Sequence, residues 1–371
     1  MNSELASDPG ESTVSVDLGD RSYPIHIATG ATGRFAAAFA ESLGDVSHVL
    51  LIYDAAVERW AEALAGQIRS ESGRVDATAV PSGEPSKSIA KFGELLDWML
   101  DRGADRRSVV VAVGGGVIGD LAGFVAASFA RGIRFVQVPT TLLAMVDSSV
   151  GGKTGINLSG AKNMVGAFWQ PELVWIDTLA MKTLPDRSYL SGLAEVIKYG
   201  VIDDAAFFDY LESNSAALVR RDPDVLRYAI RQSCLAKARV VGEDERETSG
   251  RRAILNYGHT FAHAIEATAG YGTLLHGEAV AIGMQMAASL AIQLGRCDAE
   301  VLRRQTKVLQ ACQLPITFPD ADVAAMLPVM MRDKKVAHGK LRFILPTKIG
   351  HVELVGDVDP AEVETAIAAH R

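Results

Sequence analysis

The sequence predicts two domains, an α/β domain built on a parallel sheet and then a mainly α-helical domain. Up to about residue 178, short β-branched runs alternate with segments that have helical spacing. The expected strands are 47–54, 106–116, 133–141 and 172–178. Continuous apolar strands separated by helices are typical of a parallel sheet covered on both faces. From Leu184 onwards alanine- and leucine-rich helical patterns dominate, and only 339–355 looks extended.

The boundary between the domains is expected near Pro185. The expected parts are a polar, disordered tail at 1–12, an α/β nucleotide-binding domain at 13–184 and a helical domain at 185–371. Ligands of parallel sheets bind at the carboxyl ends of the strands, so we expect the cleft between the two domains.

Composition and charge restrict the class of partner. A chain of 371 residues with 48% hydrophobic and 22% charged residues is typical of a soluble globular protein. The net charge of −8 argues against a nucleic-acid partner. The tail lacks the apolar segment of a signal peptide, and the longest apolar helical run is shorter than the roughly 20 residues that span a bilayer. Cys234, Cys297 and Cys312 have no metal-binding spacing and indicate reduced thiols, so we expect a cytoplasmic protein without a membrane partner.

A glycine-rich turn follows the second expected strand. Gly114, Gly116 and Gly119 fit the pattern G-x-G-x-x-G between a strand and a helix, where free N–H groups can bind a pyrophosphate. The alternative is a glycine turn without a ligand. The next strand ends in Pro-Thr-Thr, where a ribose-binding acid would be expected. Asp54 ends an earlier strand, which indicates a variant nucleotide fold.

The segment 145–171 combines a flexible backbone with cationic and amide donors, which are the groups needed to hold a phosphate or a polyhydroxylated anion. A solvated loop with scattered lysines is the alternative. The residues that carry this pattern are Gly151, Gly152, Lys153, Gly155, Lys162 and Asn163.

Three histidines lie within one short apolar stretch. Helical spacing predicts His259, His263 and Glu266 on one face of a helix, and His276 follows after a turn. A histidine pair on an apolar helix is more often structural than ligating. Glu195 lies in the apolar segment GLAEVIKYG, where an acid is costly unless it is paired or binds a metal. Two histidines and one glutamate would leave open positions on zinc, but spacing alone does not choose the two histidines.

Several long motifs together resemble the 3-dehydroquinate synthase family, in order from about residue 13 to the C-terminus. They are SGEPSK, GGGVIGDLAGF, VPTTLLAMVDSSVGGKTGIN, KNMVGAFWQP, GLAEVIKYG, LNYGHTFAHAIE, HGEAVAIGM and DKK. The resemblance implies a dehydroquinate synthase-like fold, a homodimer, NAD and one divalent metal ion, Zn²⁺ or Co²⁺. The implied enzyme is a phosphate-eliminating cyclase of the shikimate pathway, which converts 3-deoxy-D-arabino-heptulosonate 7-phosphate to 3-dehydroquinate and phosphate.

The resemblance also implies the site residues. The metal ligands would be Glu195, His259 and His276, with His263 facing the substrate instead. NAD would contact Asp54, Ser82, Gly83, Glu84, Pro85, Ser86, Lys87, Gly114, Gly115, Gly116, Val117, Ile118, Gly119, Asp120, Thr140, Thr141, Lys153, Lys162, Thr183 and Leu184. The catalytic residues would be Asp147, Lys153, Lys198, Asn256 and His263. The substrate-binding residues would be Asn163, Lys237, Arg252, Lys348 and, across a dimer interface, Arg131.

The implied chemistry is a transient oxidation by NAD, loss of phosphate, re-reduction and an intramolecular aldol closure, with the metal as Lewis acid. Related metal-dependent alcohol and glycerol dehydrogenases share the glycine turn and Pro-Thr-Thr but lack SSVGGKTG. Cyclases that make valiolone or deoxy-inosose act on substrates without a carboxylate, whereas Lys237, Arg252 and His263 favour a carboxylated one. An aminated substrate analogue stays open. A regulator without catalysis would be expected to lack Lys153, Lys162 or Glu195, and all three are present.

Overall fold

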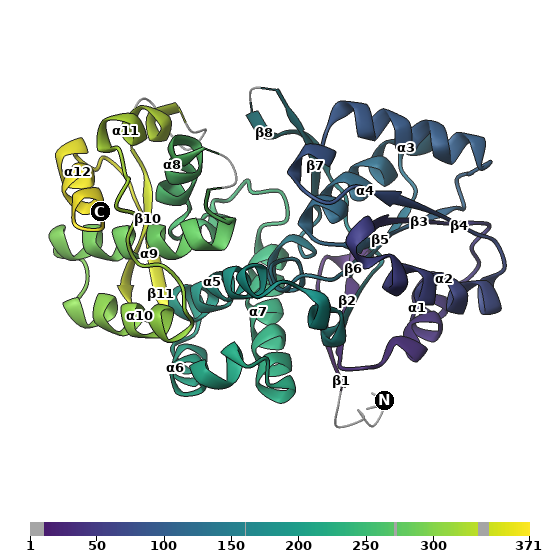
Figure 1. Ribbon diagram of the computed structural model, residues 1–371, viewed down its shortest axis with the longest axis horizontal. Helices are drawn as coiled ribbons and strands as arrows, with labels where there is room; N and C mark the ends of the chain where they lie inside the picture. The colour runs from purple at the N-terminus through teal and green to yellow at the C-terminus, as the bar shows by residue number, and fades with distance from the viewer. Residues whose placement is uncertain (1–10, 160, 271–272, 333–340) are drawn as a thin grey trace. The chain divides into compact units, whose positions relative to one another are not determined.

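The computed structural model describes residues 11–159, 161–270, 273–332 and 341–371 (Figure 1). The described chain separates into two compact units, each with its own interior. The α/β unit contains the residues up to Leu184 together with Lys237–Arg246, and the helical unit contains Pro185–Ala236 and the residues from Glu247 onwards. Residues 1–10 of the expected tail and the DKK motif at 333–335 lie outside the described residues. The expected tail bound of 12 was wrong, because Glu11 and Ser12 begin strand β1, Glu11–Val16, and pair with the next strand.

A seven-stranded sheet forms the centre of the α/β unit, in the order β1-β2-β9-β6-β5-β3-β4. Neighbouring strands run parallel, except that β1 and β2 form an antiparallel pair at one edge. The four expected strands are β3, β5, β6 and β9. The strand bounds are β1 Glu11–Val16, β2 Tyr23–Ala28, β3 Val49–Asp54, β4 Val75–Val80, β5 Val109–Gly114, β6 Arg134–Pro139 and β9 Leu173–Asp177.

Helices cover both faces of this sheet. Alternate residues of a strand point to opposite faces, so Val49 and Leu51 of β3 join one apolar cluster and Leu50 and Ile52 the other. The first cluster includes residues of α1 and α2, and the second includes residues of α3 and α4. The bounds are α1 Phe35–Leu43, α2 Glu58–Ser72, α3 Ile89–Asp101 and α4 Gly116–Ser128. Both faces of the sheet are therefore buried, which explains why the strand sequences are continuously apolar.

The segment 145–171 is more regular than the loop that its glycines and lysines predict. It begins within a short π-helix, Ala144–Ser148, and continues as the antiparallel hairpin β7 Lys153–Leu158 and β8 Ala161–Phe168. A Cβ on Gly166 would lie 2.0 Å from the carbonyl oxygen of Thr154, so the glycine allows the two strands to pair closely.

Residues 237–246 also belong to the α/β unit, whereas the helical pattern places all of 185–371 in the second domain. Helix α7, Pro223–Glu243, contributes residues to both units. Helical periodicity cannot reveal this, because it says nothing of which unit a helix packs on. Glu245 receives two hydrogen bonds from Arg21, both 2.7 Å, and one of 3.1 Å from Gln170. These contacts tie the end of the segment to the α/β unit.

In the helical unit, the buried helix α9 packs against α5, α8, α10, α12 and strand β10. The extended stretch expected at 339–355 contains the hairpin β10–β11. The bounds are α5 Asp186–Asp203, α6 Ala205–Val219, α8 His259–Ala269, α9 His276–Gln293, α10 Ala299–Ala311, α11 Val323–Arg332, β10 Phe343–Lys348, β11 His351–Val355 and α12 Pro360–Ala368. No described helix combines the length and apolar character that crossing a bilayer would require.

Two glycine substitutions should change stability in opposite directions. A Cβ on Gly283 of α9 would lie 2.2 Å from the carbonyl oxygen of Gly258, so Gly283→Ala should force α8 and α9 apart and cost about 1–3 kcal/mol. Gly66 of α2 has open space around its Cβ position, so Gly66→Ala should stabilise by up to about 1 kcal/mol. Thermal melting of both variants tests this, and a Gly283→Ala protein as stable as the wild type contradicts the close approach.

Candidate functional site

Apart from Lys153 and Lys162 of the β7–β8 hairpin, the residues implied to bind NAD lie at or after the carboxyl ends of five neighbouring strands. Asp54 ends β3, the glycine turn follows β5, and Thr140 and Thr141 follow β6. The segment 82–87 comes after β4. Thr183 is the last residue of the 3-10 helix that follows β9, and Leu184 comes directly after it. In the sheet order these strands are β9-β6-β5-β3-β4 without a gap. These candidate nucleotide residues therefore lie together at the carboxyl ends of the strands of one sheet, where parallel sheets bind their ligands.

The glycine turn has no room for side chains. A Cβ on Gly114 would lie 2.7 Å from Ile118 and 3.2 Å from the Cβ of Asp54, and a Cβ on Gly119 would lie 2.5 Å from Gln137. Helix α4 starts at Gly116, and no side chain caps its N-terminus. The turn thus brings backbone N–H groups beside Asp54, as recognition of a pyrophosphate and a ribose requires.

A polar network joins this edge to the β7–β8 hairpin. The buried ammonium of Lys87 donates hydrogen bonds to the Asp120 carboxylate and to the side-chain oxygen of Asn163. Burial raises the pKa of the Asp120 carboxyl, and the charge of Lys87 opposes that rise. Asn157 donates to Glu84 at 2.7 Å and accepts from the N–H of Asn163 at 2.9 Å. Residues implied to bind NAD and substrate are therefore in direct contact here.

The other substrate candidates of the α/β unit lie on separate elements. The Nζ atom of Lys237 donates to the backbone oxygen of Asp147 at 2.6 Å and to its carboxylate at 2.7 Å. Lys153 and Lys162 are exposed on the hairpin. Arg131 is exposed and has a left-handed backbone, with φ of 70°.

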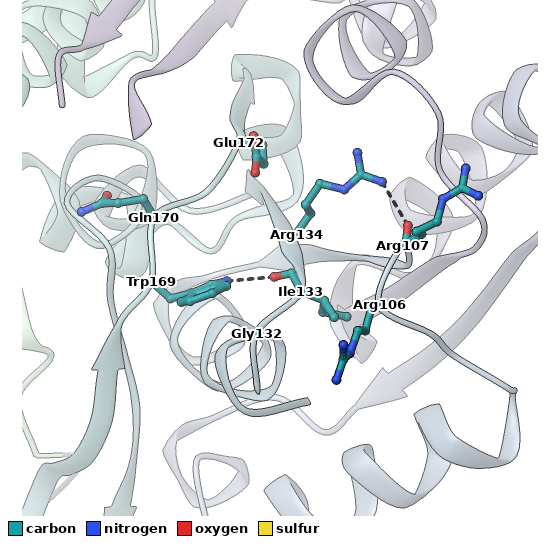
Figure 2. A pocket seen from close by; sticks show the side chains of 8 residues that line it. All are labelled: Arg106, Arg107, Gly132, Ile133, Arg134, Trp169, Gln170 and Glu172. Atoms are coloured by element: carbon teal, nitrogen blue, oxygen red, sulfur yellow. Dashed lines mark hydrogen bonds between the residues drawn. The ribbon is translucent and has the colours of Figure 1, made fainter. Parts of the chain in front are cut away.

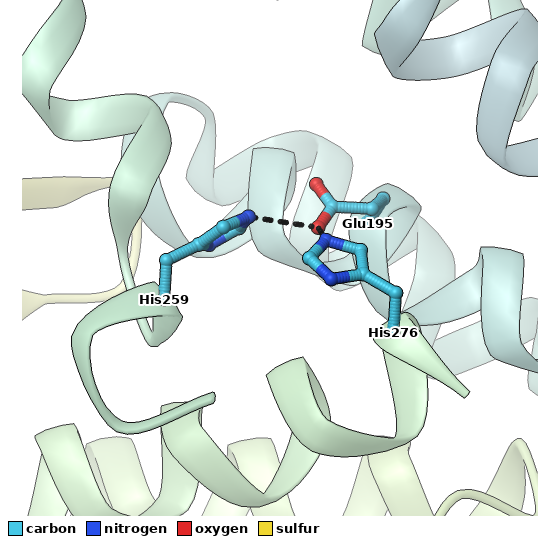
Figure 3. A group of neighbouring side chains, drawn as sticks. All are labelled: Glu195, His259 and His276. Carbon is cyan, nitrogen blue, oxygen red and sulfur yellow. Dashed lines mark ion pairs between the residues drawn. The ribbon is translucent and has the colours of Figure 1, made fainter. Parts of the chain in front are cut away.

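A three-residue cluster in the helical unit has the composition of a metal site. Glu195 of α5, His259 of α8 and His276 of α9 each offer one ligand atom, and these atoms lie within 4.8 Å of one another. The Nε2 atoms of His259 and His276 lie 3.5 and 3.8 Å from the same oxygen of Glu195. Figure 3 shows both imidazole rings directed at this carboxylate. His263 is exposed on the next turn of α8 and is not in the cluster.

The histidines are held with Nε2 toward the carboxylate. The Nδ1 atom of His259 lies 3.1 Å from the carbonyl oxygen of Tyr257, which can only accept, so in the neutral ring Nδ1 carries the proton. The Nδ1 atom of His276 lies 3.5 Å from a carboxylate oxygen of Glu266. Helical spacing predicts that Glu266 lies on the same helix face as His259 and His263, but it assigns no function to Glu266. Its position beside His276 is that of an outer partner of a metal ligand.

The surroundings of the Glu195 carboxylate show whether the cluster is suited to a metal ion. Its side chain is 0% exposed and pairs with the ammonium of Lys198, which is 1% exposed. Neither carboxylate oxygen accepts a hydrogen bond of normal geometry from the described residues. A buried carboxylate with that deficit is costly, and a divalent cation would satisfy it. Two imidazole nitrogens and a carboxylate are also ligands that zinc accepts.

The remaining substrate-binding candidates of the helical unit lie on different elements. Arg252 and Asn256 lie in the 3-10 helix Arg251–Asn256, and Lys348 is the exposed last residue of β10. The Arg252 side chain is 2% exposed, with its Nε atom 3.5 Å from the Glu247 carboxylate.

A separate pocket of about 280 Å³ lies at the opposite ends of the strands, their amino ends (Figure 2). Its lining residues precede or begin β5, β6 and β9, so they mark the amino ends of these strands. Arg134 donates to the backbone oxygens of Leu43, Asp45 and Arg107, and Trp169 donates to that of Ile133. These hydrogen bonds join segments near the amino ends of the strands, and they involve no residue of the candidate nucleotide site.

The parallel α/β unit and the helical unit with its Glu–His–His cluster define the dehydroquinate synthase-like fold, a class of two-domain enzymes. The family described as 3-dehydroquinate synthase N-terminal matches residues 77–191, and the one described as 3-dehydroquinate synthase C-terminal matches residues 192–336. A 3-dehydroquinate synthase from Rhodopirellula baltica is 63% identical over 98% of this chain and 99% of its own length. The chain belongs to the 3-dehydroquinate synthase family.

Two solved structures have the same fold. One is 2-epi-5-epi-valiolone synthase from Streptomyces hygroscopicus with NAD⁺ and Zn²⁺ bound, at 30% identity and a TM-score of 0.86, covering 95% of this chain and 98% of that one. The other is 2-deoxy-scyllo-inosose synthase complexed with carbaglucose-6-phosphate, NAD⁺ and Co²⁺. It is 26% identical, with a TM-score of 0.87, and covers 97% of this chain and 100% of that one.

Proposed function

We propose that this chain is a 3-dehydroquinate synthase, which converts 3-deoxy-D-arabino-heptulosonate 7-phosphate to 3-dehydroquinate and phosphate with NAD and one divalent metal ion. The observation that carries the proposal is the 63% identity to the Rhodopirellula enzyme over nearly the whole of both chains. The geometry of the two units supports it, because each contains a candidate site for one of the two cofactors.

Two parts of the chain would hold the cofactors. The carboxyl edge of the sheet would bind NAD, with Asp54 at the ribose and the glycine turn at the pyrophosphate. Glu195, His259 and His276 would hold the metal, and solved relatives in complex with Zn²⁺ or Co²⁺ support either ion. When bound, NAD supplies a reversible hydride acceptor, and the metal supplies a Lewis acid for substrate oxygens.

The chain's own residues would bind and orient an anionic substrate. Lys153, Asn163, Lys237 and Lys348 offer donors for phosphate and hydroxyl oxygens, and Arg252 offers two parallel donors for a carboxylate. The buried Lys198, whose ammonium pairs with Glu195, would donate to a substrate oxygen. Asp147, Asn256 and His263 would orient hydroxyl groups, and an imidazole can also donate or accept a proton in general acid–base catalysis.

The direct test is phosphate release from the heptulosonate phosphate by the purified protein. Release should require NAD and should stop when a chelator removes the metal. Substrate-dependent release that needs neither additive, in protein freed of both, would contradict the proposal.

The cofactor should be recycled, because the overall reaction involves no net oxidation. NAD should therefore be required for turnover, while absorbance at the NADH band stays flat at steady state. Simultaneous recording of phosphate and NADH absorbance checks this. NADH formed in proportion to product would instead indicate a polyol dehydrogenase.

We also infer that the protein acts as a homodimer in which Arg131 contacts the substrate of the second copy. Its exposed guanidinium and left-handed backbone support this role. Light scattering gives the oligomeric state. Mixing an Arg131→Ala chain with a chain inactivated at His276 should restore part of the activity, because one site of each mixed dimer has both residues intact.

A further inference from the structure

Three residues on one face of helix α5 contact three consecutive residues in the first turn of helix α9. The α5 residues are spaced four apart, which places them on the same side of the helix. The pairs are Glu195 with His276, Ser191 with Gly277, and Arg187 with Glu278. A candidate metal ligand from each helix thus forms one end of a continuous helix–helix contact.

The middle pair fixes the separation of the two backbones. The N–H of Gly277 donates a hydrogen bond of 3.0 Å to the hydroxyl oxygen of Ser191. A Cβ on Gly277 would lie 1.8 Å from the backbone oxygen of Ser191, so only glycine permits this approach. His276 is the neighbour of this glycine, and the contact sets how near it lies to α5.

The outer pair holds the chain that enters α9. Arg187 donates to the two carboxylate oxygens of Glu278 at 2.6 and 2.7 Å, and to the backbone oxygen of Thr273 at 2.9 Å. Glu278 in turn accepts from the N–H of Leu275 at 2.8 Å. The pair therefore restrains the residues on both sides of His276, although Arg187 itself is 56% exposed.

We propose that Arg187 and Glu278 are positioning residues that hold His276 at the metal. The inference rests on the proposed metal site of Glu195, His259 and His276. The first turn of a helix lacks intrahelical partners for its N–H groups, so it frays unless other contacts restrain it. Without Arg187 the start of α9 would be free to move, and His276 would no longer be preorganised opposite Glu195.

The test is zinc affinity of the metal-stripped full-length chain, measured by competition with a chromophoric chelator. Arg187→Ala should weaken zinc binding by about 10–100-fold, as loss of outer partners of metal ligands typically does. Arg187→Lys should lie between this variant and the wild type, because lysine restores the charge but not the paired hydrogen bonds. Arg303→Ala is the matched control, since it removes a two-point Arg–Glu pair on the surface of α10 and should leave zinc affinity unchanged.

A second readout separates positioning from general stabilisation. Cobalt replaces zinc in such sites and reports ligand geometry in its visible spectrum, so Arg187→Ala should shift the cobalt bands. If Arg187→Ala folds poorly, Glu278→Gln removes the charge yet keeps an acceptor for Leu275, and it should also weaken zinc binding.

Two outcomes would overturn the inference in distinguishable ways. A variant with a lower melting temperature but wild-type zinc affinity and cobalt spectrum would show that Arg187 only stabilises the fold. Wild-type protein that binds no zinc would remove the metal site itself, and the inference with it.

Discussion

His276→Ala should abolish both metal binding and turnover. The substitution removes one of three ligands whose donor atoms lie within 4.8 Å of one another, and alanine offers no replacement. Zinc content should fall from about one ion per chain to background. Because a metal Lewis acid contributes several kcal/mol, phosphate release should fall on the order of 10³-fold or more.

His263→Ala is the matched control for this prediction. His263 is on the same helix as His259, with ring centroids 5.7 Å apart, but it lies outside the cluster. Its removal should leave metal content unchanged even if turnover falls, since we propose a role for it at the substrate. Elemental analysis of both purified variants decides the matter. Metal lost from His263→Ala and kept in His276→Ala would show that the ligand set is wrong.

Arg252→Ala should lower kcat/KM for the heptulosonate phosphate while zinc content and NAD affinity stay at wild-type levels. The Arg252 side chain is 2% exposed, so its guanidinium has lost most of its water. Removing one partner of a buried, hydrogen-bonded charge pair costs about 2–5 kcal/mol, which corresponds to roughly 30- to 5000-fold in kcat/KM. The measurement is steady-state kinetics together with NAD titration and metal analysis.

The neighbouring residue gives the control. Arg251 is half-buried next to Arg252 in the same 3-10 helix, and no substrate contact is proposed for it, so Arg251→Ala should retain most activity. Because a buried arginine also packs, melting temperatures of both variants should be compared. An Arg252→Ala enzyme as active as wild type would mean that the carboxylate is bound elsewhere or that the substrate has none. The second reading would favour the carboxylate-free substrates of the valiolone and inosose type.

The sheet was the most predictable part of the fold, because its strands carry their own signal. The runs around β3 and β5 are apolar on both faces, and only a covered parallel sheet buries both. The β7–β8 hairpin had no such signal. Its strands are rich in glycine and lysine, and β7 packs on α4 where a Cβ on Gly123 would lie 2.4 Å from Thr154. A close approach of that kind depends on a distant element and leaves no local pattern.

The candidate site divides in the same way. Composition and spacing indicated a glycine turn and a set of histidines, but helical spacing pairs His259 with His263 and not with His276. The ligand atoms converge only because α5, α8 and α9 pack together, and the spacing of residues along the chain does not reveal that packing. The resemblance to the family supplied the set Glu195, His259 and His276, whose ligand atoms lie together in the structure. Arg187 and Glu278 are separated by 91 positions, so nothing local in the sequence connects them.

The discontinuous α/β unit has a consequence for dissecting the protein by truncation. A fragment ending at Leu184 would contain every strand of the seven-stranded sheet but not Lys237–Arg246. Arg21 and Gln170 would lose their shared partner Glu245, and Asp147 would lose the ammonium of Lys237. The chain passes between the two units after Leu184, after Ala236 and after Arg246. An independently folding nucleotide-binding fragment therefore needs the segment 237–246 rejoined through a designed linker, and a simple stop codon at the apparent boundary would produce an incomplete unit.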